Sequence, residues 1–139
     1  MSGRIVVHSL DHASAAAAAA ASLGVPVTLS SAPGAGIYGG ALWFKTLIAA
    51  AAAGHPEARI ACVLDCGDAA GAVLAGLRVG LRHLRFTGPA ATRARLAALA
   101  AEIGARIEGD ETVALLDLRG ETRPEAACRK FLGEGGTNP

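Results

Sequence analysis

Acidic and imidazole side chains stand where two predicted β-strands end. His8 and His12 follow an apolar run near the N-terminus, and Asp65 and Asp68 follow a second run at 60–64. In open α/β sheets, ligands bind outside the carboxyl ends of the strands, so neighbouring strands would bring these residues to one edge. Carboxylates and imidazoles there can exchange protons with a substrate or bind a divalent metal. The sequence identifies no cofactor, and no metal site is predicted.

A glycine-rich stretch contains Gly34-x-Gly36-x-x-Gly39 between a predicted strand and a predicted helix. This is the context of a dinucleotide-binding fingerprint, in which bare amides and a helix N-terminus hold phosphate. The motif follows the second strand rather than the first. The next acid at a strand end, Asp65, lies farther on than the ~20 residues expected for a ribose contact. Two interpretations stay open: a phosphate or nucleotide site, and a structural loop whose glycines permit tight turns.

Hydroxyl groups flank two predicted helix starts. Ser30 and Ser31 precede the glycine-rich stretch, and Thr87 with Gly88 precedes a proline that begins another helix. Hydroxyls and free amides at such places can bind an anion, so we include these residues among the candidate ligand-binding groups. The alternative is that each group caps its own turn.

Cys66 lies at a strand end before a helix, a position where the helix dipole lowers a thiol pKa. It is therefore a candidate nucleophile, with His8 or His12 as the base, although the adjacent Asp65 would oppose ionisation. No CxxC pair or zinc spacing occurs among the three cysteines. We expect reduced thiols and a cytoplasmic protein, with the other two cysteines packed in the interior.

Strand-like apolar runs alternate with alanine-rich helical stretches along the chain. We expect strands near residues 4–8, 25–30, 60–64, 83–87, 106–108 and 112–118, the last either parallel or antiparallel. The run 60–64 is continuously apolar, as in a strand covered on both faces. We predict an α/β three-layer sandwich with a mostly parallel sheet of five to six strands, flavodoxin-like or Rossmann-like. The expected order, 2-1-3-4-5, makes the first and third strands neighbours; a half-barrel closed by dimerisation is the alternative.

The helices have recognisable ends and faces. Asp11 and Asp68 are placed to cap two of them, because their side chains can accept hydrogen bonds from first-turn amides. In the helix that follows Pro89, we expect Leu96, Leu99 and Ile103 to line the buried face.

Composition narrows the class of protein. A chain of 139 residues favours a single domain, which we place at 1–132, with a disordered glycine-rich tail at 133–139. With 13 basic and 12 acidic residues, the balance gives no reason to expect nucleic acid or an anionic membrane as partner. The alanine runs are too short and too weakly apolar to cross a bilayer, which takes ~20 apolar residues. No signal peptide is apparent, which agrees with a cytoplasmic location.

Three of the five aromatic residues, Tyr38, Trp43 and Phe44, fall within seven positions. Trp43 and Phe44 are consecutive on a predicted helix and must point in different directions, so both cannot face one core. One of them is expected to reach a ligand or a partner chain, as aromatic residues do at interface centres. We therefore expect a homo-oligomer formed through this region.

The segments His8-Ser9-Leu10-Asp11-His12, PVTLSSAPG at 26–34 and Leu64-Asp65-Cys66-Gly67-Asp68 resemble a family of small bacterial α/β proteins with no known activity. The resemblance covers about residues 5–90 and implies nothing about mechanism. From the residues, the leading hypothesis is a protein that binds an anionic, phosphate-bearing small molecule at the carboxyl edge of its sheet. The alternative is a non-catalytic, homo-oligomeric structural or regulatory module.

Overall fold

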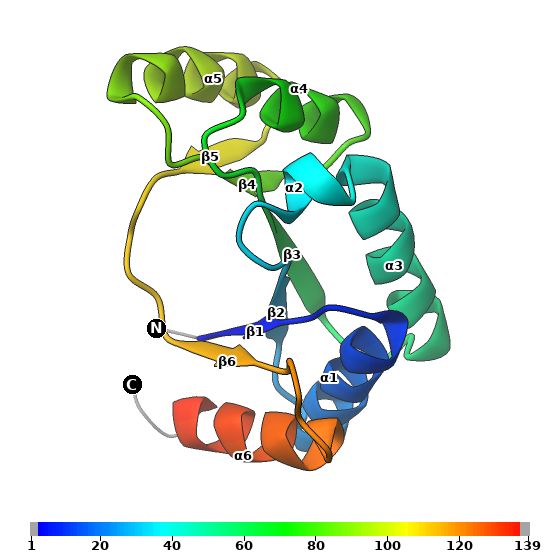
Figure 1. Ribbon diagram of the computed structural model, residues 1–139. Coiled ribbons are helices and arrows are strands. Elements are labelled where there is room, and N and C mark those ends of the chain that lie inside the picture. Colours follow the sequence, from blue (N-terminus) through cyan, green and yellow to red (C-terminus); the bar gives the residue numbers. More distant parts are fainter. Residues whose placement is uncertain (1–2, 137–139) are drawn as a thin grey trace. The chain divides into compact units, whose positions relative to one another are not determined.

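The computed structural model describes residues 3–136, in which strands and helices alternate as an α/β fold (Figure 1). The strands are β1 (Arg4–Val6), β2 (Val27–Ser30), β3 (Ile60–Asp65), β4 (His83–Arg85), β5 (Arg106–Glu108) and β6 (Leu115–Asp117). The helices are α1 (Leu10–Leu23), α2 (Ala35–Tyr38), α3 (Ala41–Gly54), α4 (Ala70–Arg78), α5 (Ala90–Glu102) and α6 (Pro124–Gly136). The predicted fold class is confirmed.

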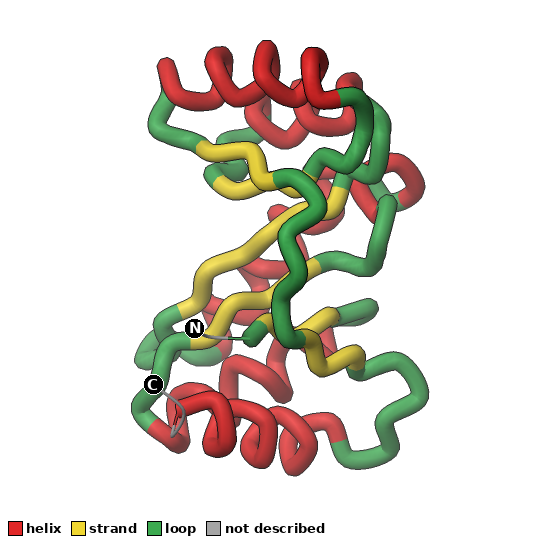
Figure 2. The backbone as a smooth tube through the Cα atoms, turned by 90° about the vertical axis from the view of Figure 1, so that its left-hand side faces the viewer, coloured by secondary structure: helices red, strands yellow, loops and turns green. Residues whose placement is uncertain are grey.

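The strands form a parallel sheet in the order β5-β4-β3-β2-β1-β6, consistent with a flavodoxin-like or Rossmann-like sandwich. The predicted order is wrong in one respect: β2 lies between β1 and β3. The last strand, whose direction the sequence left open, runs parallel to β1. The connection from β5 to β6 contains no helix (Figure 2), and it returns the chain to the far side of β1. The strand order therefore reverses once, between β1 and β6.

The contacts divide the chain into two compact units, and α3 and β3 contribute to both. Unit 1 comprises residues 3–30, 47–62 and 113–136 of the described chain, and unit 2 comprises 31–46 and 63–112. The single domain predicted for 1–132 stays a prediction. The predicted tail begins as helix, because α6 continues to Gly136, and positions 137–139 lie outside the described residues.

In unit 1, α1 packs against α6 and against the sheet. The buried face of α1 consists of alanines, among them Ala13, Ala16 and Ala20, and their small side chains let the helices approach closely. Ile5 of β1 and Leu29 of β2 are fully buried in the same core. Gly24 ends α1 as predicted, in the left-handed conformation that glycine adopts without strain.

In unit 2, α4 packs against α5 and β4. Leu64, Val73 and Leu84 are fully buried, and Gly76 of α4 faces the Leu84 side chain without room for a Cβ atom. The predicted inner face of α5 is partly wrong. Leu96 is buried, but Leu99 and Ile103 are exposed. Ala100 completes the buried stripe with Leu96, because helical neighbours on one face stand four residues apart.

Several local expectations need correction. Ser9, not Asp11, caps α1: its Oγ accepts a hydrogen bond from the His12 amide at 3.2 Å. Asp68 does not cap α4, because the residue before that helix is Ala69 and no side chain caps it. The stretch 31–40, expected as a loop, contains the single turn α2. Finally, β3 is not covered throughout, since Ala61 is exposed.

Among the helices that the structure describes, none combines the length and apolar character needed to span a membrane.

Candidate functional site

His8 and Asp117 meet at the carboxyl edge of unit 1. Parallel pairing of β1 with β6 sets Val6 opposite Asp117, so His8, two residues farther along, lies beyond the same strand ends. The His8 Nε2 atom is 2.6 Å from the Asp117 Oδ1 atom. A carboxylate at this position orients an imidazole and selects which ring nitrogen carries the proton. The pair is therefore a histidine–carboxylate dyad at a strand edge.

His12 joins this dyad from the first turn of α1. The backbone N–H of His8 donates to His12 Nδ1 at 3.1 Å, and the two rings stand edge to face with centroids 5.7 Å apart. Burial, with the nearby His8 as a second cause, lowers the pKa of His12; Asp11 and Asp117 act in the opposite direction but less strongly. Both observations indicate a neutral His12, because a ring nitrogen that accepts an N–H carries no proton.

Asp117 is held in its ionised form. Burial alone would raise its pKa, but the Arg119 amide and His8 outweigh that effect, so the pKa is lowered. The Arg119 N–H donates to the same Oδ1 atom at 2.9 Å. The carboxylate therefore remains a hydrogen-bond acceptor for His8 at neutral pH.

The place of this cluster in the topology points to ligand binding. Its residues lie at the carboxyl ends of β1 and β6, where the strand order reverses. In open α/β sheets, the crevice at such a switch point is where ligands bind. Sequence reasoning identified His8 and His12 but missed Asp117. Asp117 lies at this edge only because β6 runs parallel to β1, and the sequence left the direction of β6 open.

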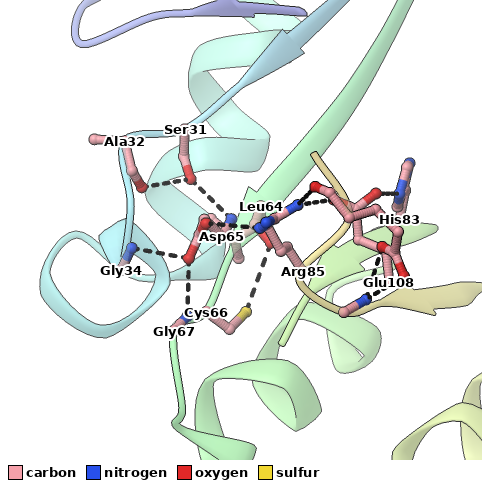
Figure 3. A network of polar contacts seen from close by, with 12 residues as sticks. Ser31, Ala32, Gly34, Leu64, Asp65, Cys66, Gly67, His83, Arg85 and Glu108 are labelled. Carbon is pink, nitrogen blue, oxygen red and sulfur yellow. Dashed lines mark hydrogen bonds and ion pairs between the residues drawn. The ribbon is translucent and has the colours of Figure 1, made fainter. Parts of the chain in front are cut away.

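At the carboxyl edge of unit 2, Asp65 fastens the glycine-rich stretch to the end of β3 (Figure 3). Its Oδ1 atom accepts the N–H groups of Gly34 at 3.0 Å and of Gly67 at 2.9 Å. Its own N–H donates to Ser31 Oγ at 2.9 Å, and Arg85 Nε lies 3.7 Å from Oδ2. The Asp65 side chain is only 14% exposed. These contacts hold the glycine-rich stretch against the end of β3, which is a structural role.

The glycines of the fingerprint pattern serve this packing. The Gly34 amide is already bound to Asp65, and a Cβ atom on Gly36 would lie 3.1 Å from Cys66 Sγ and 3.2 Å from the Asp65 carbonyl oxygen. A Cβ atom on Gly39 would lie 2.8 Å from the Trp43 ring. This geometry favours the structural interpretation of the loop; phosphate binding there stays a prediction.

The surroundings of Cys66 argue against a nucleophile, and that hypothesis stays a prediction. Its side chain is fully buried, and burial together with Asp65 raises the pKa of the thiol to about 12. A thiol with that pKa stays protonated at neutral pH, whereas the thiolate is the nucleophilic form. Burial also raises the pKa of Cys62, and that of Cys128 to about 12, and all three cysteines are free.

Polar residues of β4 and β5 form an ionic network that the sequence did not reveal (Figure 3). Glu108 accepts from Arg85 Nη1 at 2.8 Å and lies 2.6 Å from His83 Nε2. Arg85 Nη1 also donates to the Glu111 carbonyl oxygen at 3.0 Å. This network explains why β4 carries basic residues between apolar ones: they pair with β5 and with the segment that follows it.

Among the remaining predicted ligand-binding residues, Ser30, Ser31 and Thr87 have structural partners. The Ser30 carbonyl oxygen accepts the Val7 N–H at 2.9 Å, and Ser31 Oγ donates to the Ala32 carbonyl oxygen at 3.1 Å. The Thr87 N–H donates to the Gly67 carbonyl oxygen at 2.8 Å. Gly88 lies under the Phe86 ring with no room for a Cβ atom, and Asp68 is exposed.

The expected convergence of His8 and His12 with Asp65 required β1 and β3 to be neighbours, and it fails because β2 separates these strands. Instead, His8 and His12 meet Asp117. Within residues 3–136, no group of three or more histidine, cysteine, aspartate or glutamate side chains is arranged to hold a metal ion.

Comparison with family models and with curated proteins identifies no relative. No family model matches the chain, and no curated protein matches it. The resemblance to small bacterial α/β proteins therefore stays an expectation, and the function has to be argued from the site.

Proposed function

We propose that this protein binds a small anionic, phosphate-bearing molecule at the carboxyl edge of β1 and β6, beside His8 and His12. The observation that carries the proposal is the contact between His8 and Asp117 at the switch point of the sheet. Ligands of open α/β sheets bind beyond the carboxyl ends of the strands, at the switch point of the strand order.

Two positive groups beside the dyad support an anion, against the carboxylates of Asp117 and of Asp11 in the first turn of α1. Helix α1 has 14 residues and begins beside the dyad, so its N-terminus contributes a positive partial charge of about half an elementary charge. Arg119 follows Asp117 closely and supplies a full positive charge. The Asp117 Oδ1 atom is engaged by His8 and by the Arg119 amide. We infer that the carboxylate holds the imidazole while helix terminus and guanidinium attract the ligand.

We predict that a phosphate-bearing ligand shifts the backbone amide signals of residues 8–12 and 117–119 in NMR titrations. The probes are inorganic phosphate, a nucleoside monophosphate and a sugar phosphate. His12→Ala should weaken binding at least tenfold, because it removes a side chain that faces the ligand. A probe at a hundred times its dissociation constant should add ~2.7 kcal/mol to stability, seen as a higher melting temperature.

His55→Ala is the matched control for that titration, since His55 lies in unit 1 but not at the sheet edge. It should leave the affinity unchanged. Signals that move only within residues 31–40 would place the anion at the glycine-rich stretch instead, and no binding by any probe would refute the proposal.

A second candidate function is self-association through the exposed apolar side chains of Ile37, Tyr38, Leu42 and Trp43, which are close in sequence and are called the apolar patch below. Tyr38 is 84% exposed, Leu42 65% and Trp43 39%, which is unusual for side chains of this size. Phe44 is fully buried and belongs to the core, although it was expected in the interface, and its ring lies beside that of Trp43 with centroids 6.2 Å apart. Exposed aromatic and aliphatic groups close together are typical of interface centres, and we propose a second copy of this chain as the partner.

If this patch holds two copies together, Trp43→Ala should lower the molar mass measured by light scattering toward that of one chain. Loss of a buried aromatic anchor at an interface typically costs about 2 kcal/mol or more, roughly 30-fold in the dissociation constant. Leu99→Ala serves as the control, because Leu99 is an exposed apolar residue on α5, outside the patch. An unchanged mass for Trp43→Ala would reject this interface.

A further inference from the structure

We propose further that His8 and His12 form one catalytic pair, in which His8 is a general base and His12 a neutral hydrogen-bond donor. This inference rests on the proposed function. Together they move a proton on a carbon next to the carbonyl group of the bound anion. The substrate class is therefore a phosphorylated hydroxyaldehyde or hydroxyketone.

The base is His8, through its Nδ1 atom. Its Nε2 atom faces the Asp117 carboxylate at 2.6 Å, and an ionised carboxylate only accepts hydrogen bonds, so the proton resides on Nε2. In the neutral ring, Nδ1 then carries the lone pair, and this atom has no partner among the described residues. The His8 side chain is 20% exposed. A carboxylate that fixes the tautomer of a histidine is the arrangement found in hydrolytic triads.

The donor is His12, through its Nε2 atom. Because His12 Nδ1 accepts the His8 backbone N–H, the neutral ring keeps its proton on Nε2. That atom likewise has no partner within residues 3–136. A neutral imidazole in the first turn of a helix is suited to polarise a carbonyl group, since it can donate to a developing oxyanion without first losing a charge. The ring centroids are 5.7 Å apart, which allows both nitrogens to contact one small substrate.

The chemistry follows from these two groups. His8 Nδ1 takes the proton from the carbon that bears the hydroxyl group, and the electrons of that C–H bond form a carbon–carbon double bond. The carbonyl π electrons move to oxygen, which accepts a hydrogen bond from His12 Nε2. When His8 returns the proton to the same carbon, the result is exchange. For aldose–ketose isomerisation, His12 Nε2 gives its proton to the former carbonyl oxygen and takes the proton of the neighbouring hydroxyl group, and His8 returns the carbon-bound proton to the former carbonyl carbon. No oxidant, reductant or further reactant is needed.

The test is deuterium incorporation. The protein is incubated in D₂O with dihydroxyacetone phosphate or ribose 5-phosphate, and the loss of the carbon-bound proton signal is followed by NMR. We expect exchange well above the buffer rate, lowered at least ~100-fold by His8→Ala, which removes the base. Asp117→Asn should also lower it, and in the imidazole ¹⁵N spectrum should move the His8 proton from Nε2 to Nδ1. Asp117 is a positioning residue, and a merely structural role would not change the tautomer.

His55→Ala is again the control and should exchange at the rate of the unaltered protein. If the phosphates bind beside residues 8–12 but no carbon-bound proton exchanges, this inference is overturned while the binding function stands. If the amide signals show no binding at all, the proposed function is overturned, and the inference with it.

Discussion

Replacing Asp65 with alanine is expected to lower the free energy of unfolding by about 3 kcal/mol. The carboxylate accepts the N–H groups of Gly34 and Gly67 and lies beside the Arg85 guanidinium. Hydrogen bonds to a charged group contribute roughly 1.5–3 kcal/mol each, and the two donors would lose their partner in a mostly buried site. Urea-induced unfolding, followed by far-ultraviolet circular dichroism, measures the change.

Asp68→Ala is the control for Asp65→Ala. Asp68 is exposed and caps no helix, so its loss should change the free energy of unfolding by less than about 0.5 kcal/mol. Equal effects of the two substitutions would show that Asp65 does not tie the glycine-rich stretch to β3.

Gly76→Val should have an effect of similar size for a steric reason. A Cβ atom on Gly76 would lie 2.2 Å from Leu84 Cδ2 and 3.7 Å from Leu64 Cδ2. Both leucines are fully buried and have little space to move away. Overpacking a core typically costs roughly 1–3 kcal/mol, and the extra methyl groups of valine place this substitution at about 3 kcal/mol. The midpoint of urea unfolding reports it.

The same helix offers the matched control, Gly71→Val. Gly71 is exposed, and a Cβ atom added there would have no other atom within 4 Å. Valine has a slightly higher helix propensity than glycine, so stability should change by no more than about 0.5 kcal/mol. A comparable loss at both positions would contradict this explanation, because an added Cβ atom contacts Leu84 only at position 76.

The strands and helices of this fold could be predicted from the sequence, but the order of the strands in the sheet could not. Apolar runs separated by glycines such as Gly24 predicted each strand, and alternation with helices predicted parallel pairing. A crossover helix can return the chain to either side of a strand, so the order of β1, β2 and β3 was not determined. The helix-free return to β6 left that strand's direction open, and Asp117 could not be assigned to the edge that carries His8.

Local chemistry was ambiguous for a related reason: sequence spacing identifies donors and acceptors but does not pair them. The amides around Gly34 suit a phosphate, yet the chain's own Asp65 carboxylate occupies one of them. Ser9 and Asp11 are both good capping residues, and only the position at which α1 begins decides that Ser9 caps it. Cys66 precedes a helix, but its burial was not evident from the sequence, and burial is what raises its pKa.

The measurement that tests the central claim most directly is the long-range ¹H–¹⁵N spectrum of the histidine rings at neutral pH, recorded with and without inorganic phosphate. We predict a neutral His12 with its proton on Nε2, a His8 proton on Nε2 facing Asp117, and a shift of the His12 ring signals when phosphate is added. A doubly protonated His12, together with ring signals that phosphate leaves unmoved, would contradict a ligand site at the β1 and β6 edge.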